Sequence, residues 1–120
     1  MFEICIKDHI ASAHFLPGYD GMCKNLHGHT WKIEVFIVGE KLDNVGLLAD
    51  FAVLKKKLKE FLSHIDHVCL NDLPYFKKNN PSTENIAKYI YEHFSREIHP
   101  LKLSKVQVWE SDLASVIYYE

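Results

Sequence analysis

Alternation of apolar and polar residues predicts β-strands at both ends of this chain. Near the N-terminal end it covers residues 2–6 and 27–38, and the odd positions of the longer strand form one continuous face. Near the C-terminal end, strands are expected around residues 105–110 and 114–119, separated by a short polar turn. The sequence therefore predicts two pairs of consecutive strands.

Between these pairs, the apolar spacing changes to that of amphipathic helices. Asp50 can cap a first helix, whose apolar stripe runs through residues 51–65 with most of its lysines off the stripe. A second helix begins with Ser82 or Thr83 as its cap and ends near Pro100. Two helices thus separate the two strand pairs.

The strand-strand-helix-helix-strand-strand (ββααββ) order predicts an α+β fold. Strand pairs joined without helices favour antiparallel pairing, and both helices can cover one face of a four-stranded sheet. Such a sheet has two open edges. Because Val35–Val38 and Val116–Tyr119 are apolar on both faces, we expect the sheets of neighbouring subunits to join and hide those edges.

Length and composition restrict the class of protein further. A chain of 120 residues with 48% hydrophobic content predicts one domain, residues 1–120. Its 14 basic and 16 acidic residues give no electrostatic footprint for nucleic acid or an anionic membrane. Without a long apolar run or paired cysteine spacing, the expectation is a soluble, cytoplasmic protein.

Three histidines and a cysteine near the N-terminus predict a metal site. His27 and His29 are two residues apart at the start of a strand, so both imidazoles project from the same face. His14 is the nearest candidate for a third ligand. Imidazole nitrogen suits zinc first among common metals, and three histidines leave a fourth position free for water or substrate.

Cys23 has two competing interpretations. As a fourth ligand it would close a tetrahedral structural site. As a thiolate beside an open site it would take a proton from a bound substrate, which makes the protein an enzyme. The spacing between Cys23 and His27 permits both interpretations.

Two further polar features are candidates for chemistry. Asp66 and His67 form an acid–histidine pair in a turn, which fits proton transfer, although a histidine near a helix end can also simply interact with the helix dipole. Glu110 follows the alternation of Val106 and Val108 toward the core side. It can bind adjacent N–H donors of a guanine-like ring, or it can be a strand-end glutamate turned to water.

Six short motifs in this order resemble the 6-pyruvoyltetrahydropterin synthase and 6-carboxytetrahydropterin synthase family over nearly the whole chain. The motifs are Ser12-Ala13-His14-Phe15, Cys23-Lys24-Asn25-Leu26-His27-Gly28-His29, Gly46-Leu47-Leu48-Ala49-Asp50-Phe51, Asp66-His67-Val68-Cys69-Leu70-Asn71, Pro81-Ser82-Thr83-Glu84-Asn85 and Val108-Trp109-Glu110-Ser111.

The resemblance implies a role for each candidate residue. The implied zinc ligands are His14, His27 and His29, the implied general base is Cys23, and Asp66 and His67 complete the proton-transfer set. Glu110 is the implied anchor of the pterin ring, with Ser82 and Thr83 as further pterin contacts. The implied fold is the tunnelling fold, with trimers forming a barrel, two trimers stacking into a hexamer and active sites between subunits.

The interval of three residues between Cys23 and His27 looks like that of the bacterial enzyme of queuosine synthesis. The implied lyase reaction converts 7,8-dihydroneopterin triphosphate to 6-carboxy-5,6,7,8-tetrahydropterin, acetaldehyde and triphosphate. Two alternatives remain at this stage. One is the related biopterin-type synthase, which eliminates triphosphate and keeps the carbon skeleton, and the other is a zinc-stabilised binding or assembly module without catalysis.

Overall fold

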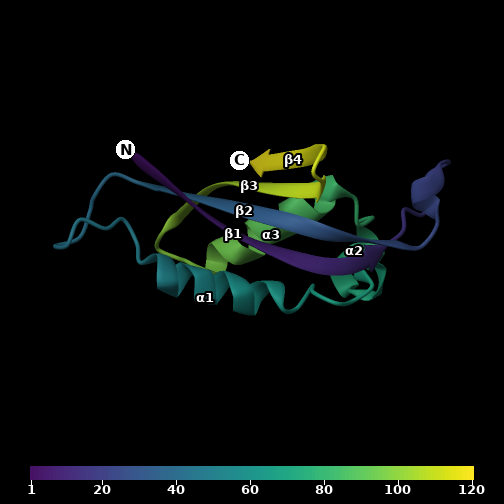
Figure 1. Ribbon diagram of the computed structural model, residues 1–120, viewed down its shortest axis with the longest axis horizontal. Helices are drawn as coiled ribbons and strands as arrows, with labels where there is room; N and C mark the ends of the chain where they lie inside the picture. The colour runs from purple at the N-terminus through teal and green to yellow at the C-terminus, as the bar shows by residue number, and fades with distance from the viewer.

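A four-stranded antiparallel sheet is the framework of the computed structural model, which describes residues 1–120. The strands are β1 (Phe2–His14), β2 (His27–Gly39), β3 (Lys102–Ser111) and β4 (Ala114–Tyr119). They lie side by side in chain order (Figure 1). Each strand therefore pairs with its neighbour in sequence, and the predicted antiparallel α+β arrangement is confirmed.

Two long helices and one short helix connect β2 to β3. The helices are α1 (Phe51–Leu62), α2 (Pro74–Lys78) and α3 (Thr83–Glu97), and two 3₁₀ turns are η1 (Met22–Lys24) and η2 (Leu70–Asp72). As predicted, the Asp50 carboxylate caps α1, and of the two candidates Ser82 is the cap of α3. The prediction of two helices missed α2, because five residues are too few for a helical period to stand out.

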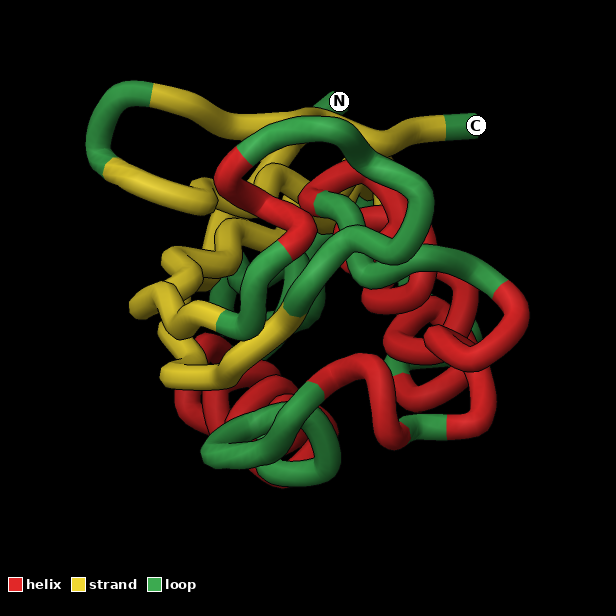
Figure 2. The backbone as a smooth tube through the Cα atoms, turned by 90° about the vertical axis from the view of Figure 1, so that its right-hand side faces the viewer, coloured by secondary structure: helices red, strands yellow, loops and turns green.

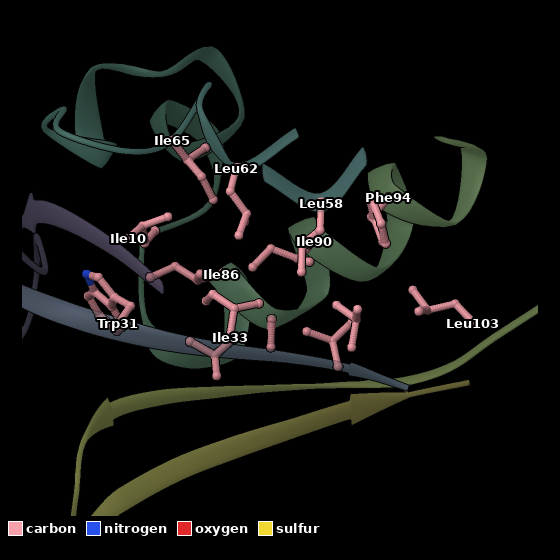
Figure 3. Packing of buried hydrophobic residues seen from close by; sticks show 14 of the residues in the cluster. Ile10, Trp31, Ile33, Leu58, Leu62, Ile65, Ile86, Ile90, Phe94 and Leu103 are labelled. Carbon is pink, nitrogen blue, oxygen red and sulfur yellow. The ribbon is translucent and has the colours of Figure 1, made fainter. Parts of the chain in front are cut away.

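The core lies between one face of the sheet and the two long helices. Trp31, Ile33, Val35 and Ile37 of β2 are fully buried, which confirms the predicted inner face. Figure 3 shows apolar side chains of both long helices meeting this face. Ile65, expected within the first helix, lies just after α1 but remains in the core.

Strand β1 extends eight residues beyond its predicted end at Ile6. Its even positions continue inward through Ile10 and Ser12 to His14, all of them buried. Asp8 interrupts the apolar alternation, so the pattern looked complete at Ile6. Continuous pairing with β2 carries the strand past this point, which is tertiary support that a sequence pattern does not contain.

The two edges of the sheet are β1 and β4. Val116–Tyr119 lies on the edge strand β4, whereas Val35–Val38 lies in β2 and pairs on both sides. Near its end, β1 is covered: the amide of His67 donates to the carbonyl of Ala11, and the amide of Ala13 donates to the carbonyl of Val68. This contact leaves the N-terminal part of β1 as open edge.

The molecule is elongated, with extents of 53 × 25 × 22 Å. The 15–26 loop, which contains η1, projects at one end, and the loop between β2 and α1 lies at the other (Figure 1). Seen from the end with the 15–26 loop, the strands lie to the upper left and the helices below and to the right (Figure 2). None of the helices is both long and apolar enough to span a membrane.

Candidate metal centre and active site

Three histidines meet on the inner face at the ends of β1 and β2. The register places His14 opposite His27 and Ser12 opposite His29, so all these side chains share one face. One nitrogen from each of His14, His27 and His29 lies within 4.8 Å of the others. We call these three residues the histidine cluster, and the predicted convergence of the three imidazoles is confirmed.

Hydrogen bonds fix which ring nitrogens of the cluster are free. Nδ1 of His14 lies 2.7 Å from the carbonyl oxygen of Pro81, and Nδ1 of His27 lies 2.6 Å from that of Asn25. Because a carbonyl only accepts, both Nδ1 atoms carry the proton, and in neutral rings both Nε2 atoms are acceptors. These two Nε2 atoms face each other at 3.0 Å.

Two lone pairs at that separation repel unless a cation lies between them. Nitrogens bound at roughly 2.0–2.1 Å to one tetrahedral ion would be about 3.3 Å apart, close to the observed distance. Nε2 of His29 is buried beside them and has no hydrogen-bond partner. The donor set therefore fits a metal ion held by three Nε2 atoms.

Burial keeps the cluster suited to metal binding. It lowers the pKa values of His14 and His29 below the usual range for imidazole, and this outweighs the opposing effects of the Pro81 carbonyl on His14 and of Glu110 on both rings. Neutral imidazole is the form that binds metals. The rings of His14 and His29 pack edge-on against Trp31, which supports them from the core side.

Glu110 lies next to the cluster. Its Oε1 is 4.0 Å from Nε2 of His29, and its Oε2 accepts a hydrogen bond of 2.9 Å from the hydroxyl of Thr83. A register shift between Trp109 and Ser111 places Glu110 at an irregularity in the pairing with β4, and such shifts redirect side chains. With a third of its side chain exposed, the carboxylate can accept hydrogen bonds from a ligand beside the metal site.

The side chains of Ser82 and Thr83 make different hydrogen bonds. The Ser82 hydroxyl accepts from the amide of Asn85, 3.2 Å away, which is an N-cap hydrogen bond at the start of α3. Thr83 is buried and holds Glu110 directly. The two residues are adjacent in sequence, but only Thr83 contacts a predicted site residue.

Cys23 lies in η1, on the loop that joins His14 to His27. Its sulfur is not part of the group of potential ligand atoms that the three histidines form. The closed four-ligand arrangement is therefore not the one in this structure, and a metal ion held by the three histidines alone would keep a free position. The Cys23 carbonyl accepts from the amide of Leu16, 2.8 Å away, which ties η1 back to the start of the loop.

Asp66 and His67 form the expected pair after α1. Nδ1 of His67 lies 2.9 Å from Oδ1 of Asp66, which also accepts from the amide of Ala11 at 2.8 Å. The Ala11 hydrogen bond and then the His67 contact hold the pKa of Asp66 below its usual range. His67 adopts a left-handed φ of 56° and exposes most of its side chain.

The structure brings some of the predicted residues together but not all of them. His67 and His29 line the same open depression, of about 560 Å³, beside β1 and β2. Cys23 does not line it, and no hydrogen bond or ion pair of the chain joins Cys23 to Asp66 or His67. His67 thus shares this depression with His29, while Cys23 lies on the loop that joins His14 to His27.

Sequence reasoning missed the groups that hold these residues in place. The Pro81 carbonyl orients His14, and the side chains of Asn71 and Asn80 bind the 15–26 loop. Asn71 and Pro81 fall inside the quoted motifs, but their partners lie more than 50 residues away. No local pattern could have assigned these contacts.

Comparisons with known proteins agree with this geometry. The family model described as 6-pyruvoyl tetrahydropterin synthase matches residues 3–120. The chain is 36% identical to the 6-carboxy-5,6,7,8-tetrahydropterin synthase of Bacillus subtilis, over 84% of this chain and 70% of the relative. It is also 36% identical to the human 6-pyruvoyl tetrahydrobiopterin synthase, over 82% and 70%.

A solved structure shows the same fold. The Caenorhabditis elegans 6-pyruvoyl tetrahydropterin synthase superposes with a TM-score of 0.88 at 27% identity, over 99% of this chain and 95% of that one. The four-stranded sheet with its helices is thus the tunnelling fold that the resemblance implied. From the matching model, the relatives and the fold together, the chain belongs to the 6-pyruvoyl tetrahydropterin synthase family.

Proposed function

We propose that this protein is a zinc-dependent lyase that converts 7,8-dihydroneopterin triphosphate to 6-carboxy-5,6,7,8-tetrahydropterin, acetaldehyde and triphosphate, the 6-carboxytetrahydropterin synthase step of queuosine synthesis. Residues 1–120 form one catalytic domain. The observation that carries the proposal is the convergence of three imidazole nitrogens beside Glu110, without a fourth protein ligand. The similarity to the Bacillus subtilis synthase supports the choice of reaction.

His14, His27 and His29 would hold the zinc ion. Bound there, zinc acts as a Lewis acid that makes hydroxyl groups of the substrate side chain more acidic. The hydrogen bonds to Pro81 and Asn25 keep the rings of His14 and His27 turned toward the ion. The pterin ring binds through Glu110, whose two oxygens accept adjacent N–H groups, and Thr83 orients that carboxylate.

Protons are moved by Cys23 and by the Asp66–His67 pair. Cys23 is the base that removes a proton from the substrate side chain. Asp66 stays ionised and binds Nδ1 of His67, so Nε2 of His67 is left to give or take a proton. Ser82, whose hydroxyl caps α3, supports the position of Thr83.

A second candidate is the 6-pyruvoyl type of reaction, in which triphosphate is eliminated and the carbon skeleton is kept. The human 6-pyruvoyl tetrahydrobiopterin synthase is as similar in identity as the bacterial 6-carboxy synthase. The interval of three residues between Cys23 and His27, which resembles the bacterial enzyme, favours the first reaction.

We further propose that the chain works as a homo-oligomer, a trimer or a dimer of trimers. The edge strand β4 exposes the apolar side chains of Ile117 and Tyr119, and the N-terminal part of β1 is an open edge. Joining β1 of one copy to β4 of another would close both edges. The resemblance also implies active sites between subunits, and in such a site Cys23 of one subunit would meet the Asp66–His67 pair of another.

Product analysis tests the reaction directly. The zinc-loaded protein is incubated with dihydroneopterin triphosphate, and the products are identified by mass spectrometry with a coupled assay for acetaldehyde. The proposal expects 6-carboxytetrahydropterin and acetaldehyde in equal amounts. A 6-pyruvoyl product without acetaldehyde would support the second candidate, and unchanged substrate would support a non-catalytic zinc-stabilised module.

A further inference from the structure

The base of the 15–26 loop is held by contacts from two distant parts of the chain. Three consecutive residues form this base: Phe15, Leu16 and Pro17. The middle one donates its amide to the carbonyl of Cys23 at 2.8 Å. The position of η1, and of the thiol on it, is therefore set by the base of the loop.

Asn71 holds the first residue of the base. Its Oδ1 accepts from the amide of Phe15 at 3.0 Å, and its Nδ2 donates to the carbonyl of Phe15 at 2.9 Å. This carboxamide thus pairs with Phe15 as a neighbouring strand would. It continues the contact that Val68 makes with Ala13 at the end of β1.

Asn80 holds the third residue of the base. Its Nδ2 donates to the carbonyl of Pro17 at 2.8 Å. Its own carbonyl accepts from the amide of Ser82 and from the side chain of Asn85, both at 2.8 Å, so the backbone at Asn80 is fixed to the start of α3. The next residue, Pro81, supplies the carbonyl that orients His14.

We propose that Asn71 and Asn80 are positioning residues, which clamp the base of the loop from two sides and so set where Cys23 stands relative to the histidine cluster. The inference rests on the proposed function, in which Cys23 is the base. Pro81, which follows Asn80, orients His14 through its carbonyl. The clamp therefore holds the loop in a fixed position relative to a proposed metal ligand. Proton transfer from a fixed substrate needs such a fixed position, because an error of about 1 Å costs up to about 100-fold in rate.

The clamp depends on the side-chain N–H donors of Asn71 and Asn80. A test can therefore distinguish it from a role in which these side chains only fill space. Changing Asn80 to Asp keeps the shape but replaces the N–H donor with an acceptor that faces the Pro17 carbonyl. Asn71→Asp keeps the contact with the Phe15 amide but loses the donor to the Phe15 carbonyl. Side chains that only filled space would tolerate both isosteric changes.

Asn79 provides a matched control. It is exposed like its neighbour Asn80, and its Nδ2 donates to a carbonyl, but that carbonyl belongs to Tyr75 in α2. Removing this hydrogen bond leaves the loop untouched. The same change from Asn to Asp can therefore be compared at three positions. In Asn71→Asp and Asn80→Asp it removes a hydrogen bond to the loop, and in Asn79→Asp it does not.

The test compares the three variants with the unchanged protein, all loaded with zinc. For Asn71→Asp and Asn80→Asp we expect kcat to fall by about 10- to 100-fold with KM nearly unchanged, because the ring still binds at Glu110. Zinc content stays the same. Residues 15–26 take up deuterium faster by hydrogen-exchange mass spectrometry, and Asn79→Asp behaves like the unchanged protein in every respect.

Three results would overturn the clamp: deuterium uptake of the loop that does not change, a loss of kcat equal to that of Asn79→Asp, or a loss of activity explained by lost zinc. Because Asn80 is exposed, its variant tests the proposal even if Asn71→Asp does not fold. If the unchanged protein leaves the substrate untouched, the proposed function fails by itself. The exchange measurement then decides the clamp, with faster uptake supporting it and unchanged uptake refuting it.

Discussion

The middle and the end of the inner face are built from the same strands but hold opposite chemistry. In the middle, Ile33, Val35 and Ile37 of β2 are fully buried in one cluster with residues of α1 and α3, and Figure 3 shows Ile33 on the side of the helices. At the end, the same alternation places His27 and His29 of β2 next to His14, which is as buried as the core residues. The period of two decides which face a residue occupies, but not what that face is used for.

The difference lies in how polar groups are satisfied. The middle contains only apolar side chains, which stabilise the fold by leaving water. The end holds imidazoles with free, buried nitrogens, including Nε2 of His29, and such groups destabilise a fold unless a partner is supplied. Stability and chemistry are therefore expected to respond to different substitutions.

Cys23→Ala tests the chemical end and has the largest expected effect. If the thiol is the base, kcat falls by about 10²–10⁴. Zinc content and thermal stability remain, because the sulfur is not part of the histidine cluster. Steady-state kinetics with metal analysis measures both, and a variant that loses its zinc would show instead that the thiol binds the metal.

Ile33→Ala tests the middle of the face. Losing a fully buried side chain of the core cluster lowers the free energy of unfolding by about 2–5 kcal/mol, measured by urea denaturation. Zinc binding and kcat stay unchanged at temperatures where the variant is folded. Val53→Ala on the half-exposed surface of α1 is the control, with a change of within about 0.5 kcal/mol. A drop in zinc affinity for Ile33→Ala would show that the two regions are coupled.

Zinc addition measures how much a bound metal ion at the histidine cluster increases the free energy of unfolding. At free zinc of about 100 times its dissociation constant, the unchanged protein gains about 2.7 kcal/mol against unfolding. His29→Ala removes one of the three proposed ligands, so most of this gain should disappear, whereas Ile33→Ala should retain it. Denaturation with and without zinc checks this, and an equal gain in His29→Ala would exclude His29 as a ligand.

Glu34 shows that a buried polar group can also be fully satisfied. This carboxylate of β2 lies on the face opposite the helices, accepts from the indole of Trp109 at 2.9 Å and lies 3.0 Å from the ammonium of Lys7. Burial alone would raise the pKa of Glu34, but the hydrogen bonds from Trp109 and Lys7 outweigh it and lower the pKa below its usual range.

The lowered pKa of Glu34 predicts how the stability of the fold depends on pH. The ionised form of Glu34 stabilises the fold fully above its unfolded-state pKa, and the contribution is lost as pH falls through the lowered folded-state pKa. Glu34→Gln should thus reduce the free energy of unfolding by about 1 kcal/mol at neutral pH and by progressively less in acid. A difference that stays constant down to the acid range would contradict this account.

Ser82→Ala has the smallest expected effect and distinguishes a helix cap from a substrate contact. Loss of the cap lowers the free energy of unfolding by about 1 kcal/mol, and Ser82→Asp restores it. KM for the pterin substrate stays unchanged in both variants. A raised KM in Ser82→Ala would show that Ser82 contacts the pterin, as the resemblance implied.

The sequence predicted the frame of the site well because that information is local. Alternation placed His27 and His29 on the buried face of their strand, and apolar stripes located the two long helices. The prediction was weaker where local patterns are short or interrupted, as with α2 and with the part of β1 beyond Ile6. Pairing with β2, rather than composition, holds that part of β1 in place.

By itself, the sequence determined the fold class, the family and the three imidazoles that converge, because these follow from periodicity, spacing and motif order. Only the tertiary structure decided which nitrogens of His14 and His27 are free, that Cys23 lies outside the cluster, and which groups hold the loop. The reason is physical: a hydrogen bond between Asn71 and Phe15, or between Asn80 and Pro17, joins residues that are far apart in the chain. Such contacts exist only once the strands and helices have packed.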